Sequence, residues 1–220
     1  MTGPRQLPLA FEHRSALRGD DFLVADCNRA AVGWIDRWPD WPGPALALHG
    51  PAGSGKSHLA AVFREKTGAF PLHPDGVGAG PDSAPAWVID GVRELLSAVG
   101  DEALLHFYNA AVEQGGYLLL IDREPPSRWQ VALADLRSRL NAASAVDIGP
   151  PDDPLLAAVL VKLFADRQLK ISSSVIDYVL PRMERSFAAA GDLVEKLDRL
   201  ALAERREITV PLARRVFDEA

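Results

Sequence analysis

Three short apolar runs in the first two thirds of the chain are typical of strands buried on both faces. They are Ala45-Leu46-Ala47-Leu48, Ala86-Trp87-Val88-Ile89-Asp90 and Tyr117-Leu118-Leu119-Leu120-Ile121-Asp122. Their apolar residues are consecutive rather than alternating, which is the pattern of a parallel sheet covered on both sides. The segments around them show helical spacing, at residues 26–38, 57–63, 101–114 and 131–140. We therefore expect an α/β domain, a parallel sheet flanked by helices.

After Pro150-Pro151 the pattern changes to helices alone, with no further strand. The four helical stretches are residues 153–166, 172–183, 190–204 and 211–219. The stretch 67–85 is rich in glycine and proline and is expected to be a long loop, with one short strand at residues 69–72. The expected organisation is an extended tail over residues 1–14, an α/β domain over 15–150 and a small all-α domain over 151–220.

Composition and charge argue against several classes of protein. The 220 residues suit one sizeable domain with a small appendage. The formal net charge of −6 argues against a large sequence-independent nucleic-acid surface, which needs a basic face. A single cysteine, Cys27, excludes an intrachain disulfide. No apolar run is long enough to span a membrane and no N-terminal signal pattern is present, so we expect a cytoplasmic protein.

The run between the first strand and its helix carries the strongest chemical signal. It reads Gly50-Pro51-Ala52-Gly53-Ser54-Gly55-Lys56-Ser57 and fits the phosphate-binding template G-x-x-x-x-G-K-[ST] at every fixed position. Glycines let backbone N–H groups turn towards phosphate oxygens, and the helix N-terminus adds partial positive charge. We expect Lys56 to contact the terminal phosphates of a nucleotide and the Ser57 hydroxyl to ligate Mg²⁺.

Polar residues at the ends of the other two strands extend this predicted site. Asp90 is placed to hold Mg²⁺ through water. In many such ATPases the next residue is an acid that orients the attacking water, but here it is Gly91, and Glu94, one turn later, is a weak substitute. We therefore expect weak intrinsic hydrolysis. Asp122 is expected on a strand between the other two, where it would sense the γ-phosphate.

Two further segments are candidates for contacts with other proteins. Arg137-Ser138-Arg139 closes the helix after the third strand, where an arginine can reach a nucleotide on a neighbouring molecule; a solvated arginine is the alternative. The N-terminal run Gln6-Leu7-Pro8-Leu9-Ala10-Phe11 has no helical period. If it is extended, its alternate apolar side chains point to one side and would enter a single groove. The alternative is that this tail folds back onto its own domain.

In this order and spacing the motifs resemble those of the DnaA/Hda-type AAA+ ATPases. The similar stretches are Asp21-Phe22-Leu23-Val24 with Asn28, Gly50 to His58, Asp122 to Pro126, and Leu136 to Leu140. The resemblance implies ADP or ATP with Mg²⁺ as cofactors. It implies that Phe22, Val24 and Asn28 lie on the adenine side and that His58 belongs to the phosphate loop. It also implies that Asp122 is the sensor and Arg139 an arginine finger acting in trans.

The resemblance further implies the partners. DnaA carries a DNA-binding domain after its lid, whereas this sequence ends at Ala220, just past the lid, so we expect no direct sequence-specific DNA binding. The tail resembles the motif by which bacterial proteins dock on the β sliding clamp of DNA polymerase III, with Gln6 in a polar subsite and Leu7, Leu9 and Phe11 in a hydrophobic pocket. The lid helix has Gly191 where the family often has an arginine, which favours ADP as the resident nucleotide.

The implied function is that of a clamp-bound, replisome-associated regulator that stimulates hydrolysis of ATP bound to DnaA and so prevents re-initiation of replication. Other functions stay open. A helicase loader of the AAA+ class would need single-strand DNA binding, which the acidic balance disfavours. A P-loop kinase would need a substrate-binding set of side chains that the helical C-terminal region does not obviously supply. A nucleotide-binding adaptor without a catalytic role is consistent with Gly91. The working nucleotide, the oligomeric state and the choice between Arg137 and Arg139 are not decided by the sequence.

Overall fold

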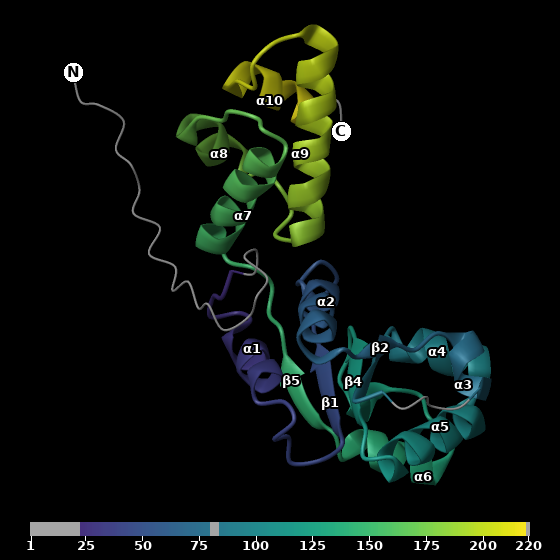
Figure 1. The fold of residues 1–220 in the computed structure, drawn as a ribbon. Coiled ribbons are helices and arrows are strands. Elements are labelled where there is room, and N and C mark those ends of the chain that lie inside the picture. Colours follow the sequence, from purple (N-terminus) through teal and green to yellow (C-terminus); the bar gives the residue numbers. More distant parts are fainter. Residues whose placement is uncertain (1–22, 80–83, 219–220) are drawn as a thin grey trace. The chain divides into compact units, whose positions relative to one another are not determined.

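A computed structural model of the chain describes residues 23–79 and 84–218 (Figure 1). It divides after Gly149 into two compact units, an α/β unit and a helical unit, which are described separately below. The fold class expected from the sequence is confirmed. The predicted clamp-binding residues Gln6, Leu7, Leu9 and Phe11 lie outside the described residues, as does Phe22.

A five-stranded parallel sheet forms the centre of the α/β unit. The strands are β1 (Ala45–His49), β2 (Phe70–Pro71), β3 (Ala86–Asp90), β4 (Tyr117–Asp122) and β5 (Ser144–Asp147). They lie in the order β2-β3-β4-β1-β5, and every neighbouring pair is parallel. The strand that carries Asp122 therefore lies between the other two predicted strands, as expected. Because the strands are parallel, their carboxyl ends meet along one edge of the sheet.

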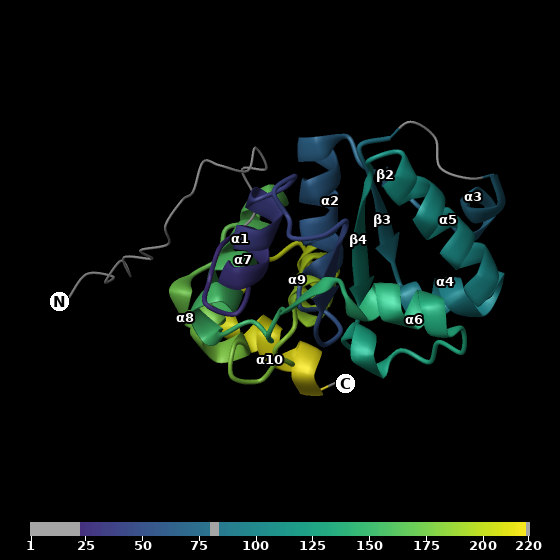
Figure 2. The ribbon, with the colours of Figure 1, turned by 90° about the horizontal axis from the view of Figure 1, so that it is seen from below.

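Helices cover both faces of the sheet (Figure 2). One face packs against α1 (Arg29–Asp36) and α2 (Lys56–Thr67), and the other against α4 (Val92–Val99), α5 (Asp101–Glu113) and α6 (Ala134–Asn141). Successive residues of β4 alternate between the two cores: Leu118 and Leu120 face α4 to α6, whereas Leu119 and Ile121 face α1 and α2. Burial on both faces explains why the strands are continuously apolar.

Some elements differ from the sequence-based expectation. The short strand expected at residues 69–72 is present as β2, but the stretch 67–85 also contains the helix α3 (Pro74–Ala79), which was not expected. Proline is tolerated in the first turn of a helix, so Pro74 begins α3 rather than excluding it. The helix expected over 131–140 begins only at Ala134, because the Asp101 carboxylate accepts hydrogen bonds from the backbone N–H groups of Ala132 and Leu133 at 2.7 and 2.8 Å. The strand β5 and the helix α4 were not expected from the apolar pattern.

The C-terminal unit contains four described α-helices around one apolar core. They are α7 (Asp153–Asp166), α8 (Ser173–Val179), α9 (Phe187–Glu204) and α10 (Val210–Asp218). Two of them begin at side-chain caps: Asp152 Oδ1 accepts from Leu155 N at 2.9 Å, and Ser186 Oγ accepts from Ala189 N at 3.1 Å. The Ser186 cap explains why α9 begins before the expected residue 190. Within the described ranges, no helix combines the length and apolarity needed to cross a membrane.

Candidate nucleotide-binding site

The loop between β1 and α2 depends on three glycines for its shape. Gly50, Gly53 and Gly55 have positive φ angles of 148°, 68° and 93°, which side-chain-bearing residues rarely adopt. Gly50 is the most restricted of them, since a Cβ built on it would lie 2.1 Å from the backbone oxygen of Ile148. The loop ends at the N-terminus of α2, so its N–H groups and the helix dipole favour an anion there. This backbone is a cradle of the kind that phosphate requires.

Lys56 is already held inside this cradle. Its Nζ donates to Gly50 O at 2.8 Å, to Pro51 O at 2.7 Å and to Ser54 Oγ at 3.3 Å. The residue is only 9% exposed. Burial lowers the pKa of the Lys56 ammonium, and the nearby Asp90 carboxylate opposes that shift. A phosphate bound in the loop would replace neutral carbonyl acceptors by charged ones, which form stronger hydrogen bonds.

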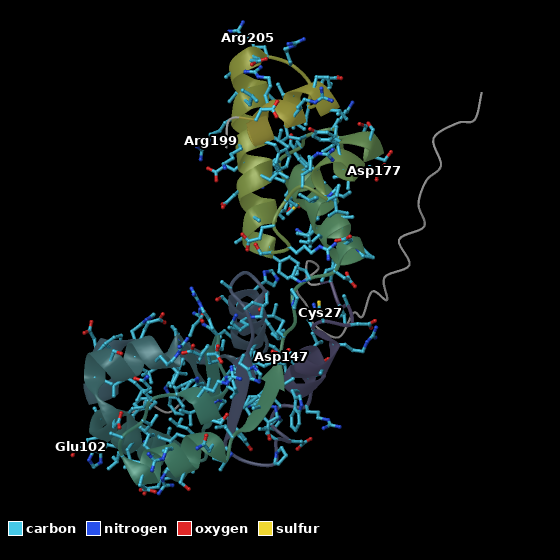
Figure 3. All side chains as sticks on the ribbon, turned by 180° about the vertical axis from the view of Figure 1, so that it is seen from behind. Cys27, Glu102, Asp147, Asp177, Arg199 and Arg205 are labelled. Atoms are coloured by element: carbon cyan, nitrogen blue, oxygen red, sulfur yellow. The ribbon has the colours of Figure 1, made fainter. Side chains whose placement is uncertain are left out.

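Acidic side chains gather at the carboxyl edge of the sheet. Asp90 ends β3, Asp122 ends β4 and Asp147 ends β5 (Figure 3 labels Asp147). His49, at the end of β1, is in register with both Asp122 and Asp147, and its Nδ1 lies 3.3 Å from Asp147 Oδ1. The apolar runs predict Asp90 and Asp122 at this edge but not Asp147, because β5 has few apolar residues, and His49 belongs to no sequence motif. All three carboxylates act on Lys56 by raising its pKa.

The residues fit a nucleotide with Mg²⁺. Ser57 follows Lys56 in α2, at the template's hydroxyl position, and the Asp90 side chain is exposed at the end of its strand. Mg²⁺ usually keeps several waters and takes only one or two protein ligands together with phosphate oxygens. Among residues 23–79 and 84–218, no group of three His, Cys, Asp or Glu side chains is placed to hold a metal by itself. A magnesium site here would therefore be completed by the phosphates of the nucleotide.

Asp122 is fully engaged within the protein. Its Oδ1 accepts from Arg93 Nε at 2.8 Å and from Arg123 N at 2.6 Å, and its Oδ2 accepts from Arg93 N at 2.9 Å. Arg93 Nη2 lies 2.6 Å from Oδ1. Burial alone would raise the pKa of Asp122, but these hydrogen bonds from Arg93 and Arg123 hold it below its ordinary value. Arg93 was not predicted from the sequence, because it lies on α4 and meets Asp122 only in the folded protein.

The Arg93–Asp122 pair predicts how stability depends on pH. The lowered folded-state pKa means that the pair stabilises the fold above the ordinary value of 3.8 and that this contribution is lost as the pH falls through the folded-state pKa. We expect Asp122→Asn to reduce the free energy of unfolding at pH 7 by about 1–3 kcal/mol, towards the lower end because Arg93 is 44% exposed. The difference from the unaltered protein should shrink as the pH falls below the ordinary pKa.

Urea unfolding over a range of pH measures this difference. Glu124→Gln is the matched control, because it removes one carboxylate from an ion pair in which Arg128 is 71% exposed. It should change the free energy of unfolding by less than about 1 kcal/mol. An Asp122→Asn protein as stable as the unaltered one at pH 7 would show that the pair contributes nothing.

On the predicted adenine side, Asn28 shapes the loop that precedes α1. It is only 2% exposed, its Oδ1 accepts from Ala25 N at 2.9 Å, and its Nδ2 donates to Leu23 O at 3.0 Å. Val24 lies inside this turn and is half-buried against the core on the α1 side of the sheet. The Asn28 side chain therefore holds the loop in place, and a direct contact of Asn28 with a base stays a prediction.

At the end of β3, Glu94 folds back over Gly91. Gly91 has φ 94°, and a Cβ built on it would lie 2.0 Å from Glu94 Oε2. The Glu94 carboxylate therefore occupies the space beside Asp90 that a side chain at position 91 would need. Glu94 thus lies nearer to the predicted site than its distance along the sequence indicates.

The two candidate finger arginines on α6 have different partners. Arg137 Nη1 donates to the backbone oxygen of Val131 at 3.1 Å. Arg139 Nε lies 3.3 Å from Asp135 Oδ1, one turn earlier on the same helix, and both side chains are partly exposed. Neither arginine has a P-loop residue among its partners in the described part of the chain. An exposed pair one turn apart is worth only a few tenths of a kcal/mol, about 0.3–0.5, so the Arg139 guanidinium exchanges partners easily.

The C-terminal unit matches a known family. Residues 153–217 match the family model described as the lid domain of Hda. This match spans the four helices α7 to α10.

The fold of the chain matches solved structures of replication proteins. Domain III of the replication initiation protein DnaA from Thermotoga maritima is similar with a TM-score of 0.75 and 16% identity, over 88% of this chain and 92% of that one. A DNA replication initiation factor is similar with a TM-score of 0.72 and 15% identity, over 84% and 64%. AMPPCP-bound DnaA from Aquifex aeolicus is similar with a TM-score of 0.64 and 17% identity, over 82% and 63%.

The chain thus spans less than two thirds of the length of the last two proteins, and at these identities the likeness is one of fold. Residues 153–217 thus resemble the lid domain of Hda, and the fold of the chain is similar to that of DnaA domain III.

Proposed function

We propose that this chain is a nucleotide-binding regulator of replication initiation that stimulates hydrolysis of ATP bound to DnaA. The observation that carries the proposal is the phosphate cradle at Gly50–Ser57, with Lys56 already inside it, in a chain whose residues 153–217 resemble the lid domain of Hda. Similar folds bind a nucleotide analogue, since the Aquifex aeolicus DnaA structure is AMPPCP-bound. DnaA is accordingly the partner that the family relation favours.

Nucleotide binding follows from the residues of the loop. The backbone N–H groups of Gly53 to Lys56 and the Lys56 ammonium would hold the phosphates of ADP or ATP, with Ser57 and Asp90 on the Mg²⁺ side. Bound Mg²⁺ supplies charge neutralisation for the β- and γ-phosphate oxygens. The turn held by Asn28 would present Val24 to the base. His58, in the first turn of α2, would stand next to the same phosphates.

The chain is expected to be a poor ATPase by itself. Gly91 provides no carboxylate directly after Asp90, and the carboxylate of Asp122 is already saturated by Arg93 and Arg123. The function that we propose does not need hydrolysis here. Nucleotide binding would instead stabilise the form of the chain that engages DnaA, since a ligand that binds one state increases its population.

Arg139 is our candidate for the trans-acting finger. Its exposed pair with Asp135 is weak, so a phosphate on a partner molecule competes well for the guanidinium. Arg137 is the more exposed of the two residues, but one of its N–H groups donates to a backbone carbonyl. An arginine finger supplied in trans accelerates phosphoryl transfer by stabilising the charge of the transition state.

Alanine substitutions of the two arginines test this assignment. In an assay of ATP hydrolysis on DnaA, Arg139→Ala should abolish the stimulation, because a trans arginine finger contributes about 10³-fold or more to the rate. Arg137→Ala, two residues away on the same helix, is the control and should retain most of it. A fully active Arg139→Ala protein would overturn the finger assignment and favour an adaptor whose nucleotide has no catalytic consequence.

The N-terminal tail supplies the second part of the proposal. Gln6, Leu7, Leu9 and Phe11 would dock on the β sliding clamp of DNA polymerase III, as the resemblance of this run implies. Holding the regulator on DNA-loaded clamp raises its effective concentration near DnaA without any new contact. Activity on DnaA should therefore depend on the clamp.

A further inference from the structure

Arg123 is held beside the P-loop by its backbone. Its carbonyl oxygen accepts from Gly50 N at 3.2 Å, and its own N–H donates to Asp122 Oδ1 at 2.6 Å. These two contacts fix the Arg123 backbone between the first glycine of the loop and the end of the central strand β4. The origin of the Arg123 side chain is therefore set by the same elements that build the phosphate cradle.

The side chain of Arg123 is uncommitted. It is exposed, and its guanidinium makes no hydrogen bond or ion pair with any residue of 23–79 or 84–218. Both neighbouring carboxylates have other partners, since Asp122 is bonded by the Arg93 side chain and Glu124 pairs with Arg128. Arg123 borders a cavity of about 600 Å³ together with Arg93, Glu94, Ser97 and Ala98, which leaves it room to change rotamer. Glu94 is the one carboxylate among these lining residues.

The charge of Arg123 reaches the phosphate site. Burial is the main cause of the lowered pKa of Lys56, and the positive charge of Arg123 lowers it further. The two cations therefore act on the same region, and among residues 23–79 and 84–218 no carboxylate forms an ion pair with both side chains. A γ-phosphate would supply that anion, and a guanidinium fork matches the oxygens of a phosphate.

The lid position at which related proteins often have an arginine is a glycine here. Gly191 of α9 has no side chain, and no heavy atom lies within 4 Å of a Cβ built there. Arg185, the arginine just before the Ser186 cap, is paired with Asp153 at 3.1 Å within the same unit. We propose that Arg123 binds the γ-phosphate of ATP in this chain and thereby distinguishes ATP from ADP. This inference rests on the proposed nucleotide binding and assigns its specificity to a residue of the α/β unit.

Equilibrium binding of AMPPCP and ADP, each with Mg²⁺, tests the assignment on the full chain. Arg123→Gln should raise the Kd for AMPPCP by about tenfold or more, while the Kd for ADP changes by less than about twofold, because only AMPPCP carries the contacted phosphate. Arg123→Lys keeps the positive charge but not the two parallel N–H donors of the guanidinium. Its Kd for AMPPCP should lie between those of the unaltered protein and Arg123→Gln. Arg128→Gln is the control, since it removes an exposed arginine five positions away that is paired with Glu124.

The outcomes distinguish the γ-phosphate assignment of Arg123 from nucleotide binding by the chain. Equal losses of AMPPCP and ADP affinity in Arg123→Gln, or no loss of either, would overturn the γ-phosphate assignment while leaving nucleotide binding intact. An unaltered protein that binds neither nucleotide would overturn both. Because Arg123 is anchored through its backbone and its side chain is exposed, these variants should fold, which circular dichroism checks.

Discussion

Lys56→Ala is expected to weaken binding of both ADP and ATP by about 100-fold, because each charge-assisted hydrogen bond to phosphate contributes roughly 1.5–3 kcal/mol. The ammonium donates to the carbonyls of Gly50 and Pro51, and the residue is almost completely buried. Burial lowers its pKa, because the loop solvates the charge less well than water does. The substitution should therefore leave the fold in place and remove the ligand.

Titration of the protein with a fluorescent ADP or ATP analogue measures this effect. Lys66→Ala is the matched control, since Lys66 is on the same helix and pairs with Asp36 at 3.1 Å. Its affinity for nucleotide should equal that of the unaltered protein. Unchanged binding in Lys56→Ala would mean that the loop does not hold phosphates.

Gly50→Ala is expected to destabilise the α/β unit by roughly 2–4 kcal/mol, through overpacking and backbone strain. The added Cβ would lie 2.1 Å from the backbone oxygen of Ile148, and neither backbone segment is a flexible side chain that can move aside. The positive φ of 148° adds strain for any residue with a Cβ. Because β1 and the segment after β5 would have to separate, nucleotide affinity should fall together with stability.

The midpoint of urea unfolding measures this loss. Gly33→Ala in α1 is the control, because nothing lies within 4 Å of its added Cβ. Alanine is favoured over glycine inside a helix, so Gly33→Ala should raise the free energy of unfolding by about 0.5–1 kcal/mol. A Gly50→Ala protein with an unchanged midpoint would contradict the close contact between the P-loop and Ile148.

The central elements of the fold were predictable because their physical signals are local. β3 and β4 are continuous apolar runs, and α7 has the expected bounds, Asp153–Asp166. The missed elements lack such signals. β5 contributes four residues with only Ala145 and Val146 apolar, and α3 contains two glycines that hide its helical period. Both elements form through contacts with neighbouring parts of the folded chain rather than through a local sequence signal.

The residues of the candidate site also differ in how well local sequence signals predict them. The phosphate loop is a contiguous template, so Lys56 and its glycines are recognised from the sequence. The Arg93–Asp122 pair joins residues 29 positions apart, and the contact of Arg123 with Gly50 joins two different strand ends. Only the sheet order brings these groups together. For Asn28 the sequence predicts a place on the adenine side of the nucleotide, but its side chain forms hydrogen bonds within its own loop.

The proposed stimulation of DnaA is tested by the rate of hydrolysis of radiolabelled ATP bound to DnaA, with this protein added, in the presence and absence of DNA-loaded β sliding clamp. We predict that the protein accelerates hydrolysis only when the clamp is present. We also predict that the acceleration disappears in Arg139→Ala and in a Gln6→Ala/Phe11→Ala variant. A rate that stays at the value for DnaA alone, although the protein is bound to the clamp, would contradict the proposed function.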